Sequence, residues 1–266
     1  MKSSAHSKIS GCAKSFDGVD IYYEFYGKKG PTLAFVHGWM CDRTYWQNQI
    51  EYFTKSHCVV TLDLGGHGKS SSGRKNWTMT SFGEDIRAIL EKLELQKVIL
   101  IGHSMGAPVI VEAAQLIPER IMALVPVDFY NDVDDRMTEK EVVEYMEQVR
   151  LDFRNWTKTA VRRWVPQNAD PRLVEWIAED MSSGPTEIGI SAMENARRNI
   201  DSLALSKVKL PIHIINSDFW LTKLEVAQKY NSDLKLSILP GAGHFLFLEK
   251  PNEFNRLLHQ VIMDLS

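Results

Sequence analysis

The stretch ILIGHSMGA, residues 99–107, decides the fold of this chain. Its first three residues are aliphatic, as in a buried strand, and its last residues are small, as at the start of a helix packed on that strand. Gly102 and Gly106 flank Ser104 in the pattern Gly-x-Ser-x-Gly, in which the serine occupies a strained strand-to-helix turn. Such a turn holds the Ser104 hydroxyl above the sheet, at the positive end of the helix. The pattern also fits a glycine-rich turn with an inert serine, so the surrounding chain has to decide.

Short apolar runs alternate with helical patterns on both sides of this stretch. An Asp-Gly turn at Asp17 and Gly18 predicts a hairpin over residues 14–26. Ser81 and Glu84 predict a capping box at the start of a helix. We expect strands at residues 32–36, 58–62, 98–101, 121–127, 211–215 and 234–239, and helices at 43–53, 82–93, 109–117, 224–230 and from 251 onward. This alternation indicates an α/β fold, a mostly parallel twisted sheet with helices on both faces.

Residues 132–205 interrupt the alternation. They contain almost no strand pattern and have helical patterns around residues 142–149, 157–165, 173–181 and 188–200. We interpret residues 132–205 as a helical cap, or lid, inserted between two strands. Residues 1–131 and 206–266 then form one α/β core.

The composition is that of an ordinary globular protein and limits the partners. Of 266 residues, 44% are hydrophobic and 24% are charged, and the formal net charge is −3. This charge offers no basis for binding nucleic acid or an anionic membrane, and no apolar run is long enough to predict a membrane span. Three cysteines without metal-ligand spacing indicate reduced thiols and a cytoplasmic protein. Residues 2–8 contain no apolar run, so we do not expect the Ile-Ser-Gly-Cys sequence at residues 9–12 to be a lipoprotein cleavage site.

Four blocks rich in glycine and histidine each follow a predicted strand. They are His-Gly-Trp at residues 37–39, Asp-Leu-Gly-Gly-His-Gly-Lys-Ser at 63–70, Gly-His-Ser-Met-Gly at 102–106 and Gly-Ala-Gly-His-Phe at 241–245. With these blocks in this order, the chain resembles the α/β-hydrolase superfamily over essentially its whole length. The resemblance implies the α/β-hydrolase fold and hydrolytic chemistry.

The resemblance also implies a role for several residues. Ser104 would be the nucleophile, and His244 would be the general base that a neutral hydroxyl needs. The backbone N–H groups of Trp39 and Met105 would form the oxyanion hole. The histidines of the other blocks are interpreted as structural residues that anchor turns through hydrogen bonds, namely His37, His67 and His103.

Two aspartates are candidates for the acid of the triad. In the family the acid usually lies in a Gly-x-x-Asp turn after a strand such as 211–215, but the ungapped position here is Trp220. Asp218 lies two residues early and would need a shorter loop. Asp128, at the end of the strand 121–127, occupies the other acid position known in the family. Either carboxylate could orient His244, so both remain candidates. We favour Asp128, and Asp218 is the alternative.

The expected enzyme is a carboxylesterase-like serine hydrolase that cleaves small to medium apolar esters through an acyl-enzyme, with no metal and no cofactor. The serine at position 104 argues against the related dehalogenases and epoxide hydrolases, which use an aspartate there. A lactonase, a thioesterase or a C–C bond hydrolase would share the same residues. A non-catalytic ligand-sensing protein of this fold is the alternative from another class.

Apolar residues beside the serine turn and in the lid are candidates for the substrate pocket. We expect substrate contacts from Trp39, Met40, Tyr145, Met146, Trp156 and Trp164. Each buried substrate methylene would contribute ~0.8 kcal/mol, which permits a chain-length preference but does not identify the substrate. Arginines of the lid are interpreted as solvated helix faces rather than as a carboxylate-binding site, namely Arg162, Arg163, Arg197 and Arg198.

Overall fold

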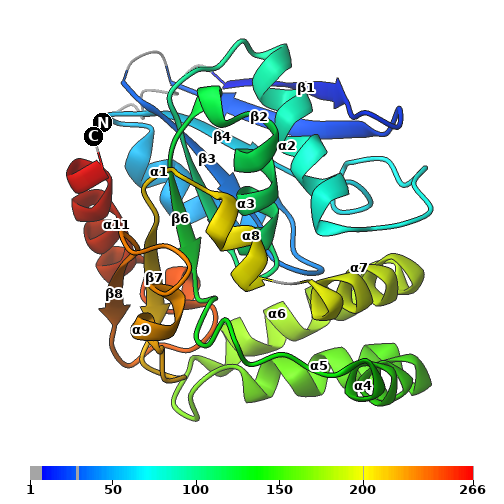
Figure 1. Ribbon diagram of the computed structural model, residues 1–266. Helices are drawn as coiled ribbons and strands as arrows, with labels where there is room; N and C mark the ends of the chain where they lie inside the picture. The colour runs from blue at the N-terminus through cyan, green and yellow to red at the C-terminus, as the bar shows by residue number, and fades with distance from the viewer. Residues whose placement is uncertain (1–7, 28–29, 200, 266) are drawn as a thin grey trace.

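The computed structural model describes residues 8–27, 30–199 and 201–265 (Figure 1). Within these ranges the chain forms an eight-stranded sheet in the order β1-β2-β4-β3-β5-β6-β7-β8. β1 and β2 form an antiparallel hairpin, β2 pairs antiparallel with β4, and all the remaining pairs are parallel. The strands are β1 (Lys8–Lys14), β2 (Asp20–Tyr26), β3 (Thr32–Val36), β4 (Cys58–Leu62), β5 (Val98–His103), β6 (Ile121–Val127), β7 (His213–Ser217) and β8 (Lys235–Leu239). The predicted mostly parallel sheet is confirmed.

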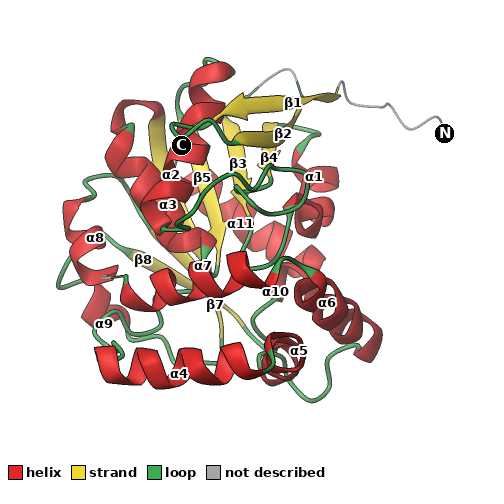
Figure 2. Cartoon of the chain, turned by 90° about the vertical axis from the view of Figure 1, so that its right-hand side faces the viewer, coloured by secondary structure: helices red, strands yellow, loops and turns green. Residues whose placement is uncertain are grey.

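Helices cover both faces of this sheet. Figure 2 shows α2 (Met79–Lys92) and α3 (Gly106–Leu116) on one side of the strands and α1 (Gln47–Phe53) on the other. α1 contacts α11 (Pro251–Leu265), and α3 contacts both α2 and α8 (Asp201–Lys207). Short helices complete the core, namely η1 (Arg43–Trp46), η2 (Pro118–Arg120), α9 (Leu224–Ala227) and α10 (Leu246–Glu249). The fold class expected from the alternating pattern is therefore the observed one.

The register of the central strands positions the site. Every residue of β3 and β5 is buried, which explains why both strands are continuous aliphatic runs. Val36 pairs with Gly102, and His103 pairs with Val127. Because these residues end parallel strands, the loops that follow β3, β5 and β6 emerge at the same edge of the sheet. Trp39, Ser104 and Asp128, which the sequence predicts as site residues, therefore follow strand ends at one edge of the sheet.

Four helices between β6 and β7 form a separate layer beyond this edge. They are α4 (Glu139–Leu151), α5 (Phe153–Arg163), α6 (Pro171–Ser183) and α7 (Thr186–Arg198). Figure 1 shows this layer below the ends of the strands, whereas α8 lies beside α3. The helices of the layer contact one another, α4 with α5 and α7, and α5 with α6. No helix in the described part of the chain is long and apolar enough to cross a membrane.

Two local predictions are wrong. The capping box of α2 is formed by Thr78 and Ser81, not by Ser81 and Glu84, because Thr78 has the extended backbone of an N-cap and its hydroxyl accepts from Ser81 N at 3.0 Å. Ser81 is therefore the third residue of the helix. The strand expected at residues 211–215 is displaced to His213–Ser217, since it pairs along its whole length with β8.

Candidate active site

Ser104 occupies the sharp turn between β5 and α3. Its backbone is left-handed, with φ of 51°, a conformation that L-residues rarely adopt. Ser104 N donates to Val127 O at 3.0 Å, and Ser104 O accepts from Ala107 N at 2.8 Å, so both sides of the turn are held by hydrogen bonds. The surrounding structure thus stabilises a strained serine, as is common at functional sites.

The two glycines of the pattern are required by close packing. A Cβ atom on Gly102 would lie 2.3 Å from Gly106 O, and one on Gly106 would lie 2.7 Å from Val36 O. Both neighbours are backbone atoms, which cannot rotate away as a side chain can. The helix α3 can start this close to β5 and β3 only because both positions lack a side chain.

His244 and Asp128 form a buried hydrogen-bonded pair beside this turn. His244 Nδ1 lies 2.7 Å from Asp128 Oδ2, and the two side chains are 11% and 0% exposed. The other carboxylate oxygen, Oδ1, accepts from Ser217 N at 2.9 Å and from Ser217 Oγ at 2.8 Å. Asp128 directly follows β6 and also has a left-handed backbone, with φ of 48°. Its carboxylate is thereby aimed at the imidazole and has hydrogen-bond donors on both oxygens.

Asp218 has a different role in the structure. Its side chain is exposed, and Oδ1 accepts from Gly241 N at 2.6 Å, which ties the end of β7 to the loop after β8. Of the two candidate acids, only Asp128 has a hydrogen bond to His244 among the contacts of the described residues.

The loop that carries His244 is held by a carboxylate and by the helical layer. Glu249 accepts from Gly243 N at 2.9 Å and from Phe245 N at 3.0 Å, so one side chain binds the amides on both sides of His244. Burial raises the pKa of the Glu249 carboxyl, although these two hydrogen bonds oppose the rise. His244 N itself donates to Trp164 O, at the end of α5, at 2.8 Å. The position of the imidazole therefore depends on contacts with two different elements.

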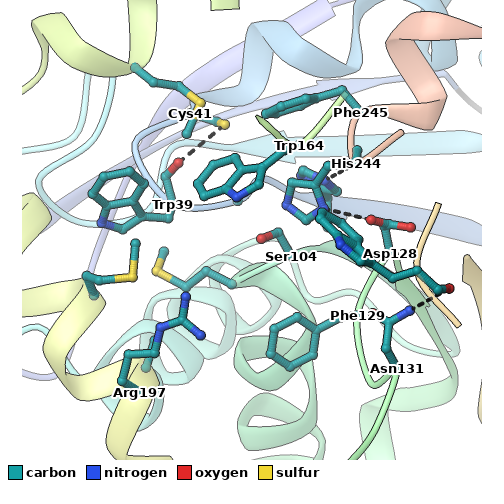
Figure 3. Close-up of a pocket in the computed structure, with 17 residues that line it drawn as sticks. Trp39, Cys41, Ser104, Asp128, Phe129, Asn131, Trp164, Arg197, His244 and Phe245 are labelled. Carbon is teal, nitrogen blue, oxygen red and sulfur yellow. Dashed lines mark hydrogen bonds and ion pairs between the residues drawn. The ribbon is translucent and has the colours of Figure 1, made fainter. Parts of the chain in front are cut away.

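Ser104 and His244 line the same cavity, which has a volume of about 260 Å³ (Figure 3). The structure has no hydrogen bond between Ser104 Oγ and His244, both of which are described residues. Such bonds are often long in unliganded hydrolytic sites and tighten when substrate binds.

The predicted oxyanion-hole residues flank Ser104. Gly38 packs so closely that a Cβ atom there would lie 3.2 Å from Ser104 Cβ. The following Trp39 and the Met105 that follows the serine are both buried. Neither of their backbone N–H groups donates a hydrogen bond to an acceptor in the described ranges. Unpaired buried amides are rare, so this pair is consistent with donors that await a ligand oxygen.

The other three histidines of the blocks bind backbone atoms. His37 Nε2 accepts from Leu64 N at 2.9 Å, and His103 Nε2 lies 2.8 Å from His244 O. His67 Nδ1 lies 3.0 Å from Gly65 O. Burial lowers the pKa of His37 to about 4 and that of His67 to about 3, so both rings are neutral at pH 7. Burial also lowers the pKa of His103.

The cavity lining differs from the predicted pocket. Trp39 and Trp164 line it, whereas the other four predicted contacts are not among its lining residues, namely Met40, Tyr145, Met146 and Trp156. The last three lie in α4 and α5, where their side chains pack against other residues rather than facing the cavity. Met146 is fully buried, and Trp156 packs edge-on against both Trp39 and Tyr145. Further side chains line the cavity, among them Met181 of α6, Met193 and Arg197 of α7, and Phe129, Asn131 and Trp220 outside this helical layer.

Comparisons with known proteins agree with this geometry. A family model described as alpha/beta hydrolase fold matches residues 31–162. A bromoperoxidase from Bacillus anthracis has a similar structure, with a TM-score of 0.83 at 20% identity over 96% of this chain and 100% of that chain. The chain belongs to the α/β-hydrolase superfamily.

Other members of the superfamily match over most of their length. The bifunctional esterase/perhydrolase of Acinetobacter calcoaceticus is 22% identical over 261 residues, 88% of this chain and 92% of that protein. The 3-oxoadipate enol-lactonase 2 of Acinetobacter baylyi is 24% identical over 251 residues, 92% of this chain and 93% of that protein. An esterase from Exiguobacterium antarcticum has a TM-score of 0.82 at 19% identity, over 96% of this chain and 100% of that chain.

Several residues of this hydrolase-fold site were missed by sequence reasoning. Ser217 binds Asp128, Glu249 holds the His244 loop, and Arg197 lines the cavity. Ser217 directly precedes Asp218 in the sequence. A carboxylate at the end of β6 needs hydrogen-bond donors, and a serine at the end of the next strand is a candidate donor. Arg197 had no such signal, because a helical pattern alone does not show which face meets the cavity. In the described ranges, no cluster of three His, Cys, Asp or Glu side chains could hold a metal ion.

Proposed function

We propose that this chain is a serine hydrolase that cleaves small to medium carboxylic esters through an acyl-enzyme. The observation that supports this most strongly is the hydrogen-bonded His244–Asp128 pair facing the cavity that Ser104 lines. A nucleophile, a base and an orienting acid around one cavity are the parts that acyl transfer needs. The relatives named esterase and perhydrolase support the same chemistry.

The reaction follows from the roles of these groups. Ser104 Oγ attacks the ester carbonyl carbon while its proton passes to His244 Nε2. The N–H groups of Trp39 and Met105 stabilise the oxyanion, a contribution worth about 10²–10³ in rate for one such donor. The intermediate collapses, and the leaving alcohol takes the proton from His244. A water molecule then attacks the acyl-enzyme by the same steps, and Asp128 stabilises the imidazolium that forms in each half of the reaction.

The helical layer α4–α7 acts in this proposal as the lid of the cavity. It supplies Met181 and Met193 to the lining, and Trp39 Nε1 donates to Gly189 O of α7 at 2.8 Å. A cavity of about 150 Å³ accommodates benzene in another protein, so 260 Å³ has room for an acyl group of several carbons.

Hydrolysis of 4-nitrophenyl acetate, butyrate and hexanoate tests the proposal. We expect steady turnover by the wild type and a loss of kcat of about 10⁴-fold or more in Ser104→Ala. Ser183→Ala, an exposed serine of α6, is the matched control and should keep full activity. Wild-type turnover no faster than that of Ser104→Ala would overturn the proposal and favour the ligand-sensing alternative.

Cyclic esters are the second candidate substrate class. Two similar proteins carry names of this kind, the enol-lactonase above and Est816, described as an N-acyl homoserine lactone degrading enzyme. Ring opening would use the same serine, histidine and amide donors. Comparing kcat/KM for a lactone with that for the open-chain ester of equal length decides which class the site prefers.

A further inference from the structure

Arg197, at the end of α7, is exposed, as expected from the sequence, but it also reaches the candidate site. Its side chain lines the cavity that contains Ser104, and Figure 3 shows the guanidinium directed toward the space beside Phe129. Arg197 Nη2 donates to Tyr145 Oη at 3.0 Å, and the guanidinium lies 4.7 Å from the centre of the Tyr145 ring. The hydroxyl group and the aromatic ring of Tyr145 therefore both hold the Arg197 guanidinium in place.

The charge of Arg197 is not neutralised by the protein. Among residues 8–27, 30–199 and 201–265, no carboxylate forms an ion pair with it. Two carboxylates of the helical layer are already paired, because Glu139 and Glu194 each bind the adjacent Arg198 at 2.6 Å, and Glu194 also pairs with Arg150. A neutral phenol is thus the only side-chain hydrogen-bond partner of the Arg197 guanidinium in the described ranges. It leaves guanidinium donors available for a ligand.

A second cavity, of about 440 Å³, meets the first one at Arg197. Both are lined by Arg197, Phe129, Asn131, Ala196 and Trp220. A substrate whose carbonyl lies at Ser104 could therefore extend past the guanidinium. Beyond these shared residues the second cavity has a mixed lining. Asp132, Asp135 and Asp201 stand beside the cations Arg136 and Lys223, and Lys223 is paired with Asp132 at 2.7 Å.

We propose that Arg197 binds a carboxylate of the substrate, so that the preferred substrates are esters or lactones whose acyl part ends in a carboxylate. The cavity between Ser104 and Arg197 is lined mostly by apolar side chains, which suits a short methylene chain between the reacting carbonyl and the anionic end. This inference rests on the proposed function, because it specifies the substrate of the same site. A planar guanidinium also matches a carboxylate with two parallel hydrogen bonds.

Two 4-nitrophenyl esters that differ only at the acyl end test this inference. In 4-nitrophenyl hydrogen glutarate a carboxylate replaces the terminal methyl of 4-nitrophenyl pentanoate. We expect the wild type to prefer the glutarate in kcat/KM, mainly through a lower KM. Arg197→Gln should reduce the glutarate-to-pentanoate ratio of kcat/KM by about 2–5-fold, since an exposed ion pair is of modest strength.

Three controls separate charge from structure. Arg172→Gln removes an exposed arginine of α6 that does not line the cavity, and should keep the wild-type ratio. Arg197→Lys should restore part of the preference. Raising the salt concentration from 0.05 to 0.5 M should lower the ratio in the wild type but not in Arg197→Gln. An unchanged ratio in Arg197→Gln, or equal losses for both esters, would overturn the inference.

A binding measurement separates this inference from the proposed function. Titration calorimetry of monomethyl glutarate against Ser104→Ala, and against Ser104→Ala combined with Arg197→Gln, needs no turnover. Weaker binding to the double variant supports the role of Arg197 even if neither ester is hydrolysed, a result that would contradict only the proposed reaction. Equal binding to both proteins contradicts the role of Arg197 whatever the activity.

Discussion

Four non-glycine residues in the loops that follow β3, β5 and β6 share the same left-handed backbone, as do Glu94 and Lys97 in the turn before β5. Met40, Ser104, Asp128 and Tyr130 have φ values of 55°, 51°, 48° and 59°. Each such residue costs of order 1–3 kcal/mol and persists only where the surrounding contacts impose it. Ser104 and Asp128 both sit directly after a central strand, where the turn points their side chains into the cavity. Two of these strained positions, Ser104 and Asp128, thus present groups of the proposed triad.

The choice between Asp128 and Asp218 is a prediction at the scale of single residues. Asp128→Asn should lower kcat about 10³–10⁴-fold, because an amide cannot stabilise an imidazolium as a carboxylate does. Asp218→Asn should leave kcat within a few-fold of the wild type, since its contact is the exposed one with Gly241 N. Steady-state kinetics on both variants, with circular dichroism to show that each is folded, is the measurement. The opposite pattern would assign the acid to Asp218.

At the scale of elements, the crossing of β5 and α3 depends on glycine. We predict that Gly102→Ala destabilises the protein by about 1–3 kcal/mol and lowers its activity, because the new methyl would meet the Gly106 carbonyl. Gly73→Ala is the control, since the nearest atom to a Cβ there is a Val19 methyl at 4.0 Å in an exposed loop. Urea denaturation of both variants measures the effect. Equal stabilities for the two would show that the crossing can relax.

The helical layer also acts on the site at this scale. α5 contributes the carbonyl of Trp164 that binds His244 N, and α7 contributes the carbonyl of Gly189 that binds the Trp39 indole. The proposed base and the proposed oxyanion loop are thus both attached to helices inserted between β6 and β7. Movement of this layer would shift both groups together, so substrate access and catalytic geometry are structurally linked.

The stability of the whole molecule should depend on pH through Asp201. Burial raises the pKa of this α8 carboxyl from 3.8 to about 7, and its hydrogen bond from Asn199 Nδ2 at 2.7 Å only partly opposes the rise. Between these values the unfolded chain has lost the proton while the folded protein still holds it. The contribution of the Asp201 carboxyl to the free energy of unfolding is therefore fully present below pH 4 and is lost as the pH rises through 7.

Replacement of Asp201 tests this dependence. We expect Asp201→Asn to gain stability relative to the wild type between pH 4 and pH 8 by about 2 kcal/mol, a value reduced because the side chain is partly exposed. Urea denaturation at pH 4, 6 and 8 gives the two curves, with the exposed Asp233→Asn as control. A difference that does not change with pH would contradict the raised pKa.

Local sequence patterns determined much of this protein. The glycines and serine at residues 102–106 set the strand-to-helix turn, and aliphatic runs set the central strands at or near their observed bounds. These features depend on steric and burial preferences of neighbouring residues, which a linear pattern records. The helical insertion was visible for the same reason, as was the hairpin with its left-handed Gly18.

Only the tertiary structure decided which distant groups meet. The hydrogen bond of His244 to Asp128 rather than Asp218 follows from the register of β6, β7 and β8, which no single segment encodes. The same holds for the cavity lining, which includes Arg197 but not four of the six predicted contacts. Helical periodicity shows that a face is apolar or charged, but the packing of one helix on another selects which side chains reach a cavity.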